Sequence, residues 1–139
     1  HIPLGLINEK NNIQEHISGK GLERIYLKKY KKKLTAEEIF LKSKDRSSVE
    51  YNFTKDFLEN LGLSLSILIN IIDPDAIVFG GGVSNSIESL DEVKKLTEKY
   101  LKSFNNLNKL NLKTVFLKPK YGDASGVRGA AILSRQNII

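Results

Sequence analysis

Four apolar residues followed directly by three glycines constrain the fold of this chain more than any other feature. The apolar run covers residues 76–79, Ala-Ile-Val-Phe, and Gly80, Gly81 and Gly82 follow at once. An apolar run without alternation is typical of a strand buried on both faces of a parallel sheet. Three glycines after such a strand let the backbone turn sharply and let a flat or anionic ligand approach closely. The segment therefore predicts a buried strand that ends in a glycine turn.

Two interpretations of this turn stay open from the residues alone: a loop that contacts a ligand and a plain strand-to-helix connection. The turn fits neither the Gly-x-Gly-x-x-Gly pattern of dinucleotide sites nor the Gly-x-x-x-x-Gly-Lys-Ser/Thr pattern of P-loops. Open α/β sheets bind ligands at the carboxyl ends of their strands, where this turn must lie. That position favours ligand contact and predicts a nucleotide-sized ligand on an α/β sheet.

Apolar residues at steps of three and four predict helices on both sides of this strand. The strongest pattern predicts a helix over residues 48–71, opened by Ser47 and Glu50 at capping-box spacing and ended by the Asp73-Pro74-Asp75 turn. The order of helix, strand, helix, strand and helix predicts an α/β fold with helices packed on a sheet. The other predicted elements are helices over residues 13–17, 21–30, 35–42, 90–104 and 125–134 and a strand over residues 114–117.

The composition fits one domain spanning residues 1–139. The hydrophobic fraction of 40% and the charged fraction of 27% are those of globular proteins, and a chain of 139 residues can bury a core without disulfides. The sequence shows neither a signal-peptide pattern nor a membrane-spanning run, so we expect a cytoplasmic protein without a membrane partner. A first residue of His1 and the absence of methionine lead us to expect a piece of a longer polypeptide.

Residues able to carry catalysis or bind metal are few. The absence of cysteine excludes disulfides, thiolate metal sites and a cysteine nucleophile. The two imidazoles, His1 and His16, have no acidic residues at metal-ligand spacing, so we expect no metal site made from this chain alone.

The formal net charge of +6 raises the question of a nucleic-acid partner. Much of the excess lies in one lysine cluster, for which a solvated helix end and linker is the favoured interpretation. Nucleic-acid binding is therefore not expected, and a noncatalytic interaction module that uses the cluster is the less favoured alternative. The lysine cluster consists of Lys28, Lys29, Lys31, Lys32 and Lys33.

Two segments carry a family resemblance. Residues 72–84 read Ile-Asp-Pro-Asp-Ala-Ile-Val-Phe-Gly-Gly-Gly-Val-Ser, and residues 122–131 read Gly-Asp-Ala-Ser-Gly-Val-Arg-Gly-Ala-Ala. The first resembles the second signature of the ROK family (repressors, open reading frames and kinases), and the second resembles its closing pattern. Both occur in the family order and near the family spacing, so together they are more specific than either alone.

The upstream part of the chain resembles the same family with departures. His1-Ile2-Pro3 resembles a Gly-His-x-x motif whose histidine lies at the sugar site, and residues 17–22 resemble a Ser-Gly-x-x-Leu stretch. Between them most members carry Cys-x-Cys-Gly-x-x-Gly-Cys-x-Glu, which holds a structural zinc and binds sugar hydroxyls through its glutamate. This region is shorter here and lacks cysteine, so structural zinc is not expected, and the place of the glutamate falls on Gln14, with Glu15 beside it.

The resemblance implies the actin-like, hexokinase-type fold, in which two α/β domains each contain a ribonuclease-H-like sheet. This chain would be most of the C-terminal domain, lacking its first strands. The family's phosphate loop and catalytic aspartate lie upstream of the histidine motif, so no catalytic residue is assigned here and the chain alone should be inactive. We expect the missing strands to come from the N-terminal half of the same protein, on this or a separate polypeptide, or from self-association into a homo-oligomer.

The implied function is that of an ATP-dependent sugar kinase of the glucokinase, fructokinase or N-acetylmannosamine kinase type. Magnesium would be bound through the nucleotide phosphates, as this cation prefers. His1, Gln14 and Glu15 would face the sugar. The alternative is the sugar-sensing domain of a ROK transcriptional repressor, which the missing zinc motif disfavours. The residues expected to line the adenosine pocket are Gly80, Gly81, Gly82 and Val83.

Overall fold

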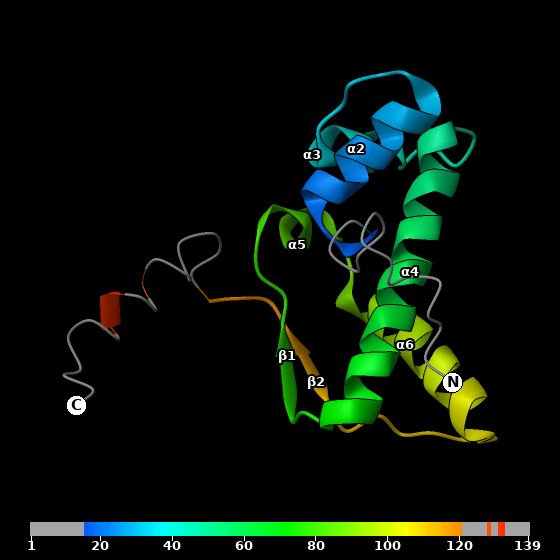
Figure 1. Ribbon diagram of the computed structural model, residues 1–139, viewed down its shortest axis with the longest axis vertical. Coiled ribbons are helices and arrows are strands. Elements are labelled where there is room, and N and C mark those ends of the chain that lie inside the picture. Colours follow the sequence, from blue (N-terminus) through cyan, green and yellow to red (C-terminus); the bar gives the residue numbers. More distant parts are fainter. Residues whose placement is uncertain (1–15, 121–127, 129–130, 133–139) are drawn as a thin grey trace.

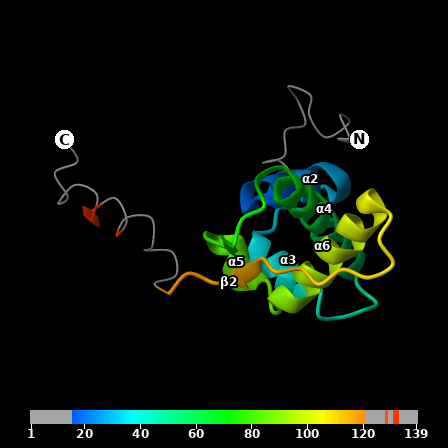
Figure 2. The ribbon, with the colours of Figure 1, turned by 90° about the horizontal axis from the view of Figure 1, so that it is seen from below.

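The structure of the chain, a computed structural model, describes residues 16–120, 128 and 131–132. Its two strands form a parallel sheet beside the long helix α4, and α6 runs alongside α4 (Figures 1 and 2). Helices α2 and α3 lie at the amino-terminal end of α4, and α5 lies between them and the sheet (Figure 1). The elements in chain order are α2 (Gly19–Tyr30), α3 (Ala36–Lys42), α4 (Val49–Ile72), β1 (Ala76–Val78), α5 (Gly82–Ser86), α6 (Leu90–Asn105) and β2 (Val115–Leu117).

Helix α4 begins one residue later than its capping pattern predicts. Ser48 is the N-cap, and its hydroxyl accepts a hydrogen bond of 3.1 Å from the Tyr51 N–H. Ser47 is instead part of the preceding turn, where its hydroxyl and N–H both donate to Asp45. The predicted Ser47–Glu50 capping box is therefore wrong, although the helix it announces is present. The helix ends at Ile72, before the Asp-Pro pair, as predicted.

The other elements predicted within residues 18–120 are confirmed with small shifts, apart from one omission. Helix α2 begins two residues earlier than predicted because Ser18 caps it, its hydroxyl accepting from the Gly21 N–H. Helix α3 has the full capping box expected of Thr35 and Glu38. The sequence does not predict the short helix α5 after the glycines, since five residues are too few to show a period. Of the predicted terminal helices, the structure describes only His16, Ile17, Arg128, Ala131 and Ile132, all helical.

The main core fills the space where α2, α3, α4 and α6 meet. It is built from aliphatic and aromatic side chains, with Tyr26 completely buried at its centre. The Tyr26 ring contacts the rings of Tyr30 and Phe53 at centroid distances of 4.8 and 5.1 Å. The buried members are Leu22, Tyr26, Ala36, Ile39, Phe53, Phe57, Leu61, Leu65, Ile87 and Val93. None of the described helices combines the length and apolar character that crossing a bilayer requires.

Two tyrosine–glutamate hydrogen bonds tie the helices together. The Tyr26 hydroxyl of α2 donates to the buried Glu50 carboxylate of α4, and burial together with this carboxylate raises the pKa of Tyr26 to about 12. The Tyr100 hydroxyl of α6 donates to Glu59 of α4 over 2.6 Å, and Lys99 also bonds this carboxylate. The two glutamates therefore link α4 to helices on either side of it.

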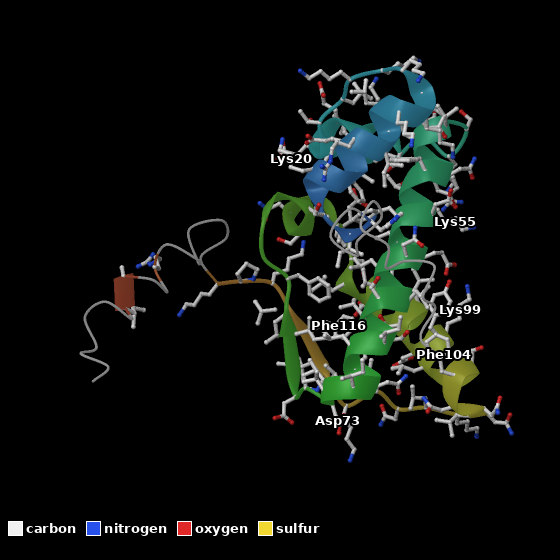
Figure 3. All side chains as sticks on the ribbon, in the orientation of Figure 1. Lys20, Lys55, Asp73, Lys99, Phe104 and Phe116 are labelled. Carbon is white, nitrogen blue, oxygen red and sulfur yellow. The ribbon has the colours of Figure 1, made fainter. Side chains whose placement is uncertain are left out.

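The strand β1 is partly buried on one face and exposed on the other, which corrects the prediction that both faces are buried. Its central residue Ile77 packs against the helices with Phe116 of β2, and Phe116 lies between the strands and α4 (Figure 3). The alternate positions Val78, Val115 and Leu117 are 59%, 50% and 44% exposed. The physical reason is that α4 and α6 cover one face of the sheet, while the described residues provide no element that covers the other.

Candidate functional site: the glycine loop and the adjoining cavity

The carboxyl end of β1 leads directly into the glycine loop, residues 80–82. The last ladder bond runs from the Phe79 N–H to the Leu117 carbonyl over 2.9 Å, so the loop begins where pairing with β2 stops. Gly81 has φ +83° and ψ 171°, a conformation that L side chains rarely adopt. Helix α5 starts at the next residue. The predicted sharp glycine turn is therefore present at the end of the predicted strand.

Ser84 closes the loop from the inside. Its hydroxyl and its N–H both donate to the Gly81 carbonyl, at 2.7 and 3.0 Å. The Ser84 side chain is buried, so water does not compete for these bonds. The sequence reasoning does not predict this role, although Ser84 is the last residue of the motif that carries the glycines. Its position in that motif is the signal that could have found it.

The space outside the loop is open. A Cβ atom built on Gly80, Gly81 or Gly82 would meet no atom of the described structure within 4 Å. At Gly62, by contrast, a Cβ would lie 2.7 Å from the Leu96 Cβ, because α4 and α6 cross closely there. Packing within the described chain therefore accounts for Gly62, and the positive φ accounts for Gly81, but neither gives a reason for Gly80 or Gly82.

A cavity of about 500 Å³ adjoins the loop. Its walls are the first turns of α2, α3 and α5, which converge at this point. This volume lies within the range of small-molecule sites, roughly 300–1,000 Å³. Lys20 lies on the outer side of α2, at the rim (Figure 3). The lining residues are Ser18, Gly19, Lys20, Glu23, Thr35, Ala36, Glu37, Gly82 and Val83.

The cavity wall contains one positively charged and one negatively charged side chain that contact each other. The Lys20 ammonium contacts the Glu23 carboxylate at 2.9 Å, and the other Glu23 oxygen accepts from the Ala36 N–H at 3.1 Å. The hydrogen bond from Lys20 is the main cause that lowers the pKa of Glu23. The carboxylate thereby connects the first turn of α2 to the start of α3, so two of the three walls are joined by hydrogen bonds.

The remaining predicted site residues are not brought to this cavity by the described structure. His1, Gln14 and Glu15, the predicted sugar contacts, lie outside the described residues, as does most of the closing motif over residues 122–131. His16 lines a second cavity of about 330 Å³ between α2 and α4, together with Lys28 and Lys29. All five members of the lysine cluster are exposed. Within residues 16–120 the structure therefore unites two of the predicted nucleotide contacts, Gly82 and Val83, with one cavity.

The sequence pattern of the ROK family matches residues 9–137, nearly the whole chain. The chain belongs to the ROK family. The N-acetyl-D-glucosamine kinase of Photobacterium profundum is 33% identical to this ROK chain over 127 residues, 91% of the chain and 40% of that protein. The N-acetyl-D-glucosamine kinase of Vibrio cholerae is 32% identical over 125 residues, 90% of the chain and 39% of that protein. This ROK chain thus spans about two fifths of the length of the curated relatives it matches.

Solved structures of ROK proteins share the fold. A ROK family glucokinase from Streptomyces griseus, crystallised in complex with glucose and AMPPNP, superposes with a TM-score of 0.72 at 21% identity, covering 91% of this chain and 45% of that one. The ROK hexokinase from Thermus thermophilus superposes with a TM-score of 0.67 at 19% identity, covering 91% and 42%. The predicted family and its actin-like, hexokinase-type α/β fold are confirmed.

The cysteine zinc motif expected of many ROK members does not fit this chain. The sequence contains no cysteine, so the thiolate ligands of such a site are absent from it. In the described part of the chain no three His, Asp or Glu side chains gather into a group that could hold a metal ion. No step of the chemistry proposed below is therefore assigned to zinc.

Proposed function

We propose that this chain forms the nucleotide-binding part of an ATP-dependent sugar kinase, in which the γ-phosphoryl group of ATP is transferred to a sugar hydroxyl. The observation that carries the proposal is the glycine loop, which has open space outside its three Cα atoms and the 500 Å³ cavity beside it. A backbone without side chains lets a flat nucleoside or its phosphates approach closely. The naming of the relatives as kinases and the AMPPNP in the Streptomyces structure support the same assignment.

The residues of this chain would bind and orient the nucleotide. Gly80, Gly81 and Gly82 would contact it through the backbone, and Val83 would add apolar contact from the first turn of α5. The convergent first turns of α2 and α3 would enclose its other side. Phosphoryl transfer depends mainly on such positioning and on charge stabilisation. None of these residues is placed to act as the catalytic base, and none is assigned that role.

A magnesium ion would enter with the nucleotide. Mg²⁺ usually keeps several waters and binds through phosphates with one or two carboxylates. We propose that this ion is held chiefly by the phosphate oxygens of the nucleotide. When bound, the ion would neutralise the charge that develops on the transferred phosphoryl group.

On the sugar side, His1, Gln14 and Glu15 are proposed to face the acceptor. We infer that the acceptor is a hexose or an N-acetylhexosamine, because the relatives named above are N-acetyl-D-glucosamine kinases and the solved neighbours are a glucokinase and a hexokinase. We also propose that the activity needs the N-terminal half of the protein, that the protein forms a homo-oligomer and that it works in the cytoplasm.

Gly80→Val tests the nucleotide assignment. A Cβ atom at this position would meet nothing within 4 Å, and the backbone there needs no positive φ, so the melting temperature should stay within about 2 °C of wild type. The valine side chain would occupy the place proposed for the ligand, so the dissociation constant of MgATP should rise at least tenfold. Unchanged MgATP affinity in the variant would contradict the proposal.

Activity is tested with the protein expressed from its complete gene. We expect ATP-dependent phosphorylation of glucose or N-acetyl-D-glucosamine, followed as ADP release, and no turnover by residues 1–139 alone. No turnover by the complete protein with either sugar, or with fructose and N-acetylmannosamine, would contradict the kinase assignment. Sugar binding without ATP binding would favour the sugar-sensing repressor instead.

A further inference from the structure

Gly19 lies in the cavity wall on α2, close to Ala36 of α3 and Val83 of α5. A Cβ atom on Gly19 would lie 2.8 Å from the Val83 Cγ2 atom and 3.7 Å from the Ala36 Cβ atom. The first distance is shorter than real Cβ contacts, and the second is ordinary van der Waals contact. Residue 19 therefore has room for a hydrogen only, and the residue that forbids more is Val83, the first side chain after the glycine loop.

We propose that Gly19 is a positioning residue for the nucleotide loop: its missing side chain lets Val83 seat against α2 and thereby fixes where the glycine loop stands. This inference rests on the nucleotide-binding function proposed above. It assigns a physical reason to a glycine that would otherwise weaken its helix, because glycine is less favourable than alanine in helical positions.

The α2 and α3 walls are held in place, so they resist displacement. The Ser18 hydroxyl caps the first turn through the Gly21 N–H, and the Leu22 N–H donates to the Ser18 carbonyl. Glu23 joins this turn to the Ala36 N–H of α3. Behind them, Leu22 is completely buried in the main core.

The α5 wall is the shortest of the three, and we expect it to yield instead. Helix α5 is five residues long and has no side-chain hydrogen bond at its N-cap, which is Gly81. Val83 is stiff at its first side-chain torsion because it is β-branched, so it relieves a clash mainly by moving its backbone. A methyl group at residue 19 would therefore push Val83 outward, and the glycine loop directly before it would follow. Because Val83 also packs against the main core, the variant would lose some stability in addition to the change in cavity shape.

The test is a double-mutant cycle on Gly19 and Val83 in the protein expressed from its complete gene. The variants are Gly19→Ala, Val83→Ala and the double variant, each titrated with MgATP and assayed for turnover. We expect Gly19→Ala to raise the dissociation constant and the KM of MgATP about tenfold, with kcat and the sugar KM changed less than threefold. Val83→Ala removes the clashing methyl groups, so adding it to Gly19→Ala should bring the MgATP constant to within threefold of Val83→Ala alone.

Gly62→Ala is the matched control. It introduces a still closer contact, 2.7 Å to the Leu96 Cβ, but between α4 and α6 and away from the cavity. It should lower the melting temperature at least as much as Gly19→Ala while leaving the KM of MgATP unchanged. This control separates a general loss of stability from an effect on the loop.

The outcomes discriminate between the inference and the function it rests on. If the wild-type protein binds MgATP and Gly19→Ala binds it equally well, or if Val83→Ala gives no rescue, the positioning role is wrong and the nucleotide assignment stands. If Gly62→Ala raises the KM of MgATP as much as Gly19→Ala does, the effect is general destabilisation and the positioning role is wrong. If the wild-type protein does not bind MgATP, the proposed function and this inference both fail.

Discussion

Removing one hydroxyl group, in Tyr26→Phe, tests how the α2–α4 junction is stabilised. The Tyr26 hydroxyl donates to Glu50 Oε1 over 2.5 Å, and both side chains are buried. Phenylalanine keeps the ring and its contacts with Tyr30 and Phe53, so the substitution deletes the hydrogen bond and little else. It leaves a buried carboxylate without this donor.

The expected loss of stability depends on whether the Glu50 carboxylate is ionised. Hydrogen bonds to charged groups contribute about 1.5–3 kcal/mol, and leaving a buried charged partner unsatisfied costs at the upper end of that range. The nearby charges of Lys42 and Lys32 favour the ionised form of Glu50 in either variant, so the carboxylate that loses its donor is a charged one at pH 7. We expect the free energy of unfolding at pH 7 to fall by about 2 kcal/mol.

The pH dependence distinguishes this mechanism from a packing defect. The hydrogen bond from Tyr26 is the main cause that lowers the pKa of Glu50 in the folded protein. A lowered folded-state pKa gives stability that is present above the unfolded pKa, about 4.3, and is lost as the pH falls through the folded value. The difference in the free energy of unfolding between wild type and Tyr26→Phe should therefore reach its full value at pH 7 and should shrink below about pH 4.

Urea unfolding followed by circular dichroism at pH 7 and at pH 3.5 measures both the size of the stability loss and its dependence on pH. Tyr100→Phe is the control, because Glu59 keeps its bond to Lys99 when the Tyr100 hydroxyl is removed. Its loss should be below about 1 kcal/mol, as for a partly exposed bond with a second partner. The reasoning would be refuted if Tyr26→Phe lowered the free energy of unfolding no more than Tyr100→Phe does. It would also be refuted if the effect of Tyr26→Phe were the same at both pH values.

Three further substitutions test the fold. Ser48→Ala removes the cap of α4 and should cost about 1 kcal/mol in urea unfolding; a neutral result would mean that the cap is replaced by water. Gly62→Ala forces α4 and α6 apart and should cost about 1–3 kcal/mol, measured as a lower melting temperature. Val78→Thr lies on the exposed sheet face, so it should change stability by less than about 0.5 kcal/mol and reduce binding of a hydrophobic dye; a larger loss would show that this face is covered in solution.

The helices and strands of this chain are largely predictable from local chemistry. Proline fixes the end of α4, and the threonine–glutamate pair fixes the start of α3. Ser47 and Ser48 show the limit of such reasoning. Both are good capping residues, and the choice between them depends on Asp45, which engages Ser47 in the preceding turn. A competition between neighbouring hydrogen bonds is not visible in a spacing rule.

The burial of each strand face and the walls of the candidate site depend on contacts between residues that are far apart in the sequence. A rule based on residue spacing cannot predict such contacts. The apolar run of β1 predicts two buried faces, but the described elements cover one, since residue type records what a face prefers and not which element covers it. The glycine loop is predictable from its residues and its place after a strand. The cavity walls contributed by α2 and α3 cannot be predicted in this way, because residues such as Gly19 and Val83 come into contact only after the chain folds.

The two hydrogen bonds that Ser84 donates to the Gly81 carbonyl restrict the ligand atoms that this carbonyl could contact. The Gly81 carbonyl oxygen has two lone pairs, and the amide and hydroxyl of Ser84 occupy both. This oxygen is therefore a poor ligand for a cation and a poor acceptor for a further hydrogen bond from an amino or hydroxyl group of a ligand. A nucleotide bound as proposed would therefore present an apolar face, and not a hydrogen-bond donor, to the Gly81 carbonyl oxygen.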